Sequence, residues 1–173
     1  MAFCARNPPF FDAGAAQLFL LAPMLVLHQT ATFSLTHDSV HNWLYSQWTG
    51  INSTAVARAE CEVILACVRH LKCTKLLNNS LADEDGWAGL VSWVAESFIE
   101  QLAQEGILAI AWVLPTHSYA LCSTQKVLQK YTLLGRKKPL IDVFLDVESA
   151  YAWLMRWPKN SDWPIDDLLP ASS

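Results

Sequence analysis

The sequence predicts an α/β domain built on a mixed, mostly parallel sheet of about five strands, with an N-terminal hairpin and alternating helices. Three observations predict it. Two short runs rich in aromatic and β-branched residues, 31–36 and 42–48, come first. Amphipathic helical patterns then alternate with short apolar runs, and residues 107–113 are almost continuously hydrophobic, as in a strand covered on both faces. A hairpin followed by repeated strand–helix units implies parallel strands joined by right-handed crossovers.

The first elements are a hairpin and a helix. Residues 37–41 separate the two runs and are typical of a hairpin turn. Ser53 then offers an N-cap, because its hydroxyl can accept a hydrogen bond from a backbone N–H of the first helical turn. Apolar residues recur at intervals of three and four on one side of this helix: Val56, Ala59, Val63, Cys67 and Leu71.

A third strand and a second helix follow. Residues 74–78 predict a short strand that ends at the polar turn Asn78-Asn79-Ser80. Gly106 is placed to close the second helix as its C-terminal cap. That helix is predicted from one apolar stripe: Trp87, Leu90, Val91, Val94, Phe98 and Leu102.

The last elements repeat the alternation. Pro115 ends the central strand 107–113, and a weaker helical pattern covers 118–131. Residues 140–144 predict the final strand. Asp146 then caps a helix that runs to residue 154.

The chain of 173 residues is predicted to form one domain, 24–155, because a chain of this size buries about 70% of its unfolded surface in a single core. Residues 1–23 are interpreted as an N-terminal extension. The apolar run 18–27 is too short to cross a bilayer, which takes about 20 residues, so no stable membrane insertion is expected. Residues 156–173 lack a hydrophobic period and are interpreted as a C-terminal tail.

Composition and motifs exclude several classes of function. A net charge of −4, with 12 basic against 16 acidic residues, argues against a nucleic-acid partner. Five cysteines without a Cys-x-x-Cys pair encode neither a disulfide framework nor a zinc knuckle, so a cytoplasmic setting is expected. His37 and His41 fall on a hairpin turn, where their spacing does not predict a metal site. No phosphate loop, dinucleotide fingerprint or nucleophile elbow is present, so neither an enzyme nor a cofactor is predicted.

The order of these segments resembles the SpoIIAA-like group of small bacterial proteins in the STAS/CRAL-TRIO superfamily. The resemblance covers roughly residues 32–155 and rests on many moderately specific features: Asn42-Trp43-Leu44-Tyr45, Trp48-Thr49-Gly50, Cys61-Glu62, Ile64-Leu65, Leu76-Leu77-Asn78, Trp93-Val94, Gly106, Ala111-Trp112-Val113 and Ala150-Tyr151-Ala152-Trp153-Leu154. It implies a STAS-like fold and no reaction, since one fold hosts many functions.

The resemblance directs attention to one serine. In the anti-sigma-factor antagonists of the superfamily, a serine near the end of a central strand is phosphorylated and controls partner binding. Ser80 is the nearest candidate here, within the regulatory or partner site Asn78, Asn79 and Ser80. The Asp-Ser pairing of those regulators is missing, and an ordinary polar turn is the alternative interpretation.

Eight tryptophans are the other unusual feature. Most are expected to fill the core, and Trp87, Trp93 and Trp112 are candidates to line an apolar pocket or a partner surface. Three functions stay open. The first is a non-catalytic interaction or regulatory module with a protein partner; the second is a carrier of a small apolar ligand; the third is an unrecognised enzyme. Nothing in the sequence settles whether the chain forms a homodimer.

Overall fold

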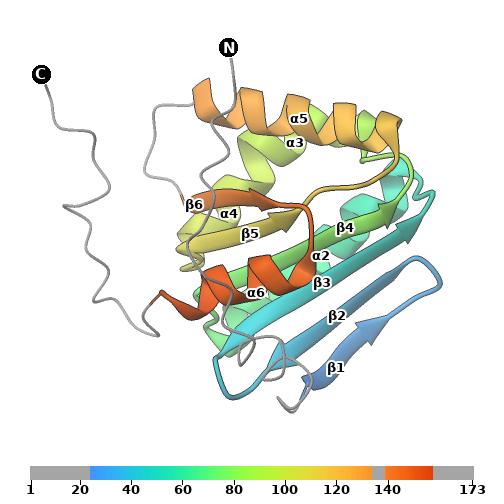
Figure 1. Ribbon diagram of the computed structural model, residues 1–173. Helices are drawn as coiled ribbons and strands as arrows, with labels where there is room; N and C mark the ends of the chain where they lie inside the picture. The colour runs from blue at the N-terminus through green and yellow to red at the C-terminus, as the bar shows by residue number, and fades with distance from the viewer. Residues whose placement is uncertain (1–23, 134–138, 158–173) are drawn as a thin grey trace, which may run out of the picture.

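A computed structural model describes residues 24–133 and 139–157. These residues form an α/β fold around one six-stranded sheet in the order β1-β2-β3-β4-β5-β6 (Figure 1). The predicted extension, 1–23, and residues 158–173 of the predicted tail lie outside the described residues. The prediction of a mixed α/β sheet is confirmed.

Two of the five strand pairings in the sheet are antiparallel and three are parallel. β1 (Met24–Gln29), β2 (Phe33–Asp38) and β3 (Trp43–Gly50) pair antiparallel in succession. β4 (Lys75–Asp83), β5 (Ala109–Val113) and β6 (Leu140–Phe144) then add in parallel. The sequence predicted about five strands, and the sheet has six. β1 was missed because its residues continue an apolar run that begins at Leu18 and hides a strand boundary.

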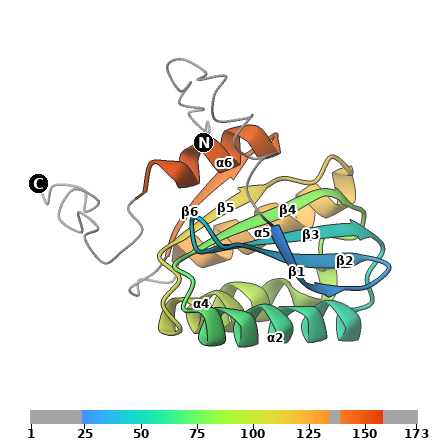
Figure 2. The same cartoon turned by 90° about the horizontal axis from the view of Figure 1, so that it is seen from below.

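Helices cover the two faces of the sheet unequally. α2 (Thr54–Leu71), α3 (Val91–Trp93), α4 (Ile99–Gln104) and α5 (Ser118–Leu133) pack on one face, here called the inner face. α6 (Val147–Met155) packs on the opposite, outer face, as Figure 2 shows. Because each parallel strand is added beside the preceding one, crossovers of a single hand place all connecting helices on the same side.

The predicted N-caps are confirmed. The Ser53 hydroxyl accepts a hydrogen bond from the Val56 N–H at 3.3 Å, at the start of α2. The Asp146 carboxylate accepts one from the Ser149 N–H at 2.7 Å, at the start of α6. Both side chains satisfy an N–H that has no partner within its helix.

Three further sequence predictions are wrong. The stripe predicted to face the core from the first helix does not: Val56 and Ala59 are exposed, and α2 instead buries Ala57, Glu60, Cys61, Ile64, Leu65 and Val68. The strand expected to end at Asn78 continues to Asp83, because β4 keeps pairing with β3 up to the Gly50 position. Asn79 and Ser80 are therefore strand residues and not turn residues. Trp87 does not belong to the second helix: its backbone is left-handed, with φ of +55°, and a 3₁₀ turn begins only at Ala88.

Two hydrophobic layers form the core. The larger lies between the inner face and α2–α5 and includes Leu35, Trp48, Ile64 and Ile110. The smaller lies under α6, where Ala109, Ala111 and Ala150 are fully buried and let the helix approach the sheet closely. Within residues 24–133 and 139–157, no helix is both long and apolar enough to span a bilayer.

Candidate functional site

Asn78 and Ser80 form a buried polar network on the inner face. The Asn78 Oδ1 accepts hydrogen bonds from the Ser46 hydroxyl and from the Trp48 indole N–H, both at 2.9 Å. The Ser80 Oγ accepts from the Asn78 amide and from the Trp112 indole N–H, both at 3.2 Å. Ser80 is 1% exposed, so a kinase would reach its hydroxyl only after β4 and its cover had separated.

Trp87 and Trp112 meet beside this network, and Trp93 lies apart from it. Trp87 packs edge-on against Trp48 at 4.6 Å between ring centroids and lies 5.6 Å from Trp112. With Asn78 and apolar side chains of α4 they line a cavity of about 10 Å³, room for about one water molecule. Trp93 instead stacks on Phe98, outside the cavity lining.

Asn79 points to the opposite face from its two neighbours. Its amide donates to the Tyr45 hydroxyl at 2.7 Å, and its Oδ1 accepts from the Leu81 N–H. Burial raises the pKa of Tyr45, so the phenol is neutral and accepts this hydrogen bond. The three residues predicted as one site are thus divided between two faces of the sheet, because successive strand residues alternate.

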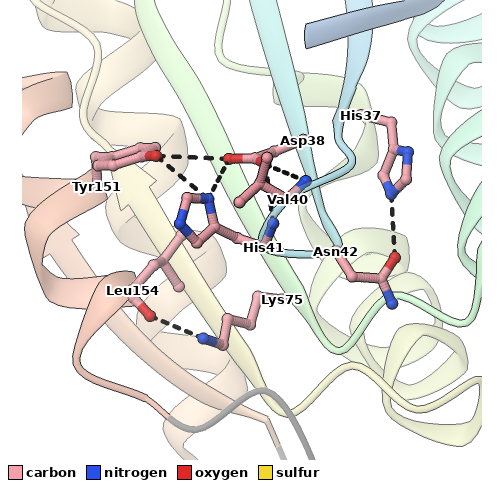
Figure 3. Close-up of polar contacts among 8 residues, drawn as sticks. All are labelled: His37, Asp38, Val40, His41, Asn42, Lys75, Tyr151 and Leu154. Carbon is pink, nitrogen blue, oxygen red and sulfur yellow. Dashed lines mark hydrogen bonds and ion pairs between the residues drawn. The ribbon is translucent and has the colours of Figure 1, made fainter. Parts of the chain in front are cut away.

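A second polar cluster, absent from the sequence predictions, lies on the outer face (Figure 3). This outer-face cluster comprises Asp38, His41 and Tyr151. The Asp38 carboxylate is fully buried; one oxygen accepts from the Val40 and His41 N–H groups at 2.9 Å, and the other lies 2.7 Å from the His41 Nδ1. The Tyr151 hydroxyl is 3.5 Å from both Asp38 and His41.

The outer-face cluster ties the β2–β3 turn to α6. The His41 ring stacks on Trp43, and Tyr151 meets Trp43 edge-on at 4.8 Å, so aromatic rings enclose the imidazole. Burial and the neighbouring Asp38 raise the pKa of Tyr151 to about 12, which keeps its hydroxyl protonated. An imidazole held by a carboxylate can serve as a base, but here the pair organises a turn and a helix contact.

Lys75 of β4 also holds α6 to the outer face of the sheet. Its ammonium donates to the backbone carbonyls of Leu154, at 2.9 Å, and of Trp157, at the end of α6. The side chain is 2% exposed, and its nitrogen lies 5.4 Å from the Trp43 ring. A cation at the negative end of a helix dipole stabilises that end and satisfies carbonyls with no helical partner.

A third candidate is the surface at the carboxyl ends of the parallel strands. Ile51 follows β3, Tyr119 opens α5 after β5, and Leu145 follows β6; they are 72%, 58% and 80% exposed. Because β3 to β6 run parallel, these three segments lie at the same end of the sheet. We call this the carboxyl-end surface, with Glu84 and Asp85 from the loop after β4.

Hydrogen bonds and close packing join the loops of the carboxyl-end surface. The Glu84 N–H donates to the Gly50 carbonyl at 3.0 Å, and the Thr116 hydroxyl donates to the Leu81 carbonyl at 3.1 Å. A Cβ on Gly86 would lie 2.4 Å from the Ala120 carbonyl oxygen, so the loop is seated directly against α5. The surface therefore has a fixed shape.

The carboxyl-end surface is acidic. The segments 51–53, 84–87, 114–117 and 145–146 contain Glu84, Asp85 and Asp146 and no lysine or arginine. Beneath them, burial raises the pKa of Asp83 to about 6. Exposed apolar side chains around carboxylates favour a partner that is both basic and apolar.

Comparison of the chain with protein-family models, curated proteins and solved structures finds no match. In the part of the chain that the structure describes, no group of three or more histidine, cysteine or carboxylate side chains is placed to hold a metal ion. The candidate sites are therefore interpreted from their own geometry.

Proposed function

We propose that this chain is a non-catalytic, STAS-like interaction module that binds a protein partner through the carboxyl-end surface. The observation that carries the proposal is the exposure of Ile51, Tyr119 and Leu145 in three separate segments at the carboxyl end of the parallel strands. Several large apolar side chains exposed at the same end of a domain indicate a contact site more strongly than a single exposed one does.

The chemistry of the partner follows from charge. Glu84 is exposed and the described loops around it carry no lysine or arginine, so a partner segment with lysine or arginine beside an apolar side chain is complementary. The filled interior supports an interaction module over a ligand carrier, since the cavity beside Trp87 holds about one water molecule.

Site-specific photocrosslinking in cells of the native source tests the proposal. A benzophenone amino acid at position 51, 119 or 145 is expected to give one adduct of the same added mass from all three sites. Leu133 is the matched control, because it is 84% exposed and lies at the other end of α5 from Tyr119. The same adduct from position 133, or no common adduct from the three sites, would refute the proposal.

A charge reversal tests the partner chemistry separately. Glu84→Lys is expected to reduce the adduct yield from position 51 at least about fivefold, because it replaces attraction by repulsion at a partner's cation. Glu62→Lys makes the same change at an exposed position of α2 and should leave the yield unchanged. Equal yields for both variants would contradict a basic partner.

A further inference from the structure

β1 lies at one edge of the sheet, and within the described residues it pairs only with β2 (Figure 1). Alternate residues of an edge strand direct their backbone N–H and C=O groups away from the sheet, where another strand can pair with them. Leu25 and Val26 follow each other in β1 and are 58% and 56% exposed. Because successive strand residues point to opposite faces, β1 has an exposed apolar side chain on each face of the sheet.

Two contacts on the inner face hold β1 in place. Leu27 lies at a β-bulge between Val26 and His28 and packs against the larger hydrophobic layer. The His28 Nε2 lies 2.7 Å from the carboxylate of Glu60, a buried residue of α2. These contacts anchor the second half of the strand and leave Leu25 and Val26 exposed ahead of the bulge.

The opposite edge strand, β6, is protected against pairing. Pro139 precedes it and has no N–H. The Leu140 N–H donates to the Leu108 carbonyl within the sheet, so by alternation the Val143 N–H faces outward. The exposed carboxylate of Asp142 accepts from this outward N–H at 2.9 Å and adds a charge to the edge. β1 contains no proline and no aspartate, glutamate, lysine or arginine, so it lacks both kinds of protection.

The chemistry of β1 favours a second copy of the same strand as its partner. In an antiparallel pair related by a two-fold axis, both sides of the contact come from one short segment. The only titratable side chain of β1, His28, is directed to Glu60 of α2, so two copies bring no like charges opposite each other. Leu25 and Val26 of each copy can cover the same apolar side chains of the other, whereas a charged peptide finds no opposite charge on β1.

We infer that two copies of this chain pair antiparallel through β1, close to Val26, and join their sheets into one continuous sheet. Stable protein interfaces usually bury about 1,200–2,000 Å², and one pair of short strands buries less, so the dimer is weak, with a Kd of about 10–100 µM. The contact uses the side edge of the sheet and not the strand ends that form the carboxyl-end surface. The inference is therefore independent of the partner surface proposed above.

Sedimentation equilibrium of the full chain, between about 10 and 500 µM, tests the inference. A reductant prevents links through the exposed Cys122. The wild-type chain is expected to show a monomer–dimer equilibrium. Val26→Lys should raise the Kd at least about tenfold, because it places two like charges at the paired edge. Leu133→Lys makes the same kind of change at an 84% exposed residue that ends α5, and it should leave the Kd unchanged. A chain that stays monomeric up to 500 µM, or equal effects of the two variants, would overturn the inference.

Nuclear Overhauser effects between chains locate the contact on the unmodified protein. In a mixture of ¹⁵N-labelled and ¹³C-labelled chains, isotope-filtered spectra are expected to connect β1 amides of one copy with the Leu25 and Val26 methyl groups of the other. Contacts between copies that involve only other elements, such as α2 or the carboxyl-end surface, would refute pairing through β1. If Val26→Lys does not fold, these spectra of the wild-type chain still decide.

Discussion

Asp38→Ala is expected to destabilise the fold by about 4 kcal/mol. The carboxylate is fully buried and accepts three hydrogen bonds of 2.9 Å or shorter, two from the turn backbone and one from His41. A hydrogen bond to a charged group contributes about 1.5–3 kcal/mol, and loss of one partner of a buried charged network costs about 3–5 kcal/mol. Adding the free energies of three separate hydrogen bonds would overestimate the loss of stability, because all three share one carboxylate and are not independent.

Urea unfolding measures the effect. The midpoint should fall while the slope of free energy against urea stays constant, which indicates a change in stability and not in the denatured state. Asp38→Asn should lose less, about 1–2 kcal/mol, since its remaining oxygen can still accept from the turn. The exposed Asp142→Ala is the control and should change stability by less than about 0.5 kcal/mol. A loss below about 1 kcal/mol for Asp38→Ala would refute the structural role assigned to it.

Three further predictions concern the loops and α6. Gly86→Ala should lower stability by at least about 2 kcal/mol more than Gly50→Ala in thermal unfolding: both glycines have φ near +60°, but only the first has a neighbour, Ala120, within reach of a Cβ. The raised pKa of Asp83, about 6, makes the folded state bind the proton more tightly, so stability should fall as pH rises from about 4 to 6; Asp83→Asn should remove that slope in unfolding curves measured across this range. Lys75→Met should speed amide hydrogen exchange in α6 at least about tenfold and leave α2 unchanged, because it removes the donor to the last carbonyls of α6; equal exchange in both helices would contradict this.

Local signals predicted much of the fold. The hairpin, the two N-caps and the central strand depend on residues close together in the sequence, and Ser53 and Asp146 cap as expected. The end of β4 was misplaced, because Asn78-Asn79-Ser80 has the composition of a turn. Pairing with β3 on one side and β5 on the other keeps Asn78 and Asn79 extended, and their side chains find partners across the sheet.

The outer-face cluster could not be predicted from the sequence. Asp38 and His41 are three residues apart, but Tyr151 joins them from 113 residues away, and no local pattern encodes that contact. Trp87 was placed on a helix because it continues an apolar stripe. Its side chain is indeed buried, and only its backbone departs from the period. A hydrophobic period predicts which side chains are buried, but it does not show that the backbone of each of them is helical.

The order of the strands bears on how the chain is assembled during synthesis. Each strand of the sheet pairs only with its neighbours along the chain, so every new strand can be added to an edge that already exists. The contacts with α6 depart from this local order: Lys75 has an acceptor 79 residues downstream at Leu154, and Asp38 lies beside Tyr151, 113 residues downstream. Until α6 has been made, the Lys75 ammonium and the Trp43 ring lie on an uncovered outer face. A chain truncated before residue 147 therefore lacks α6. Its Lys75 ammonium and Trp43 indole would stay exposed on the outer face.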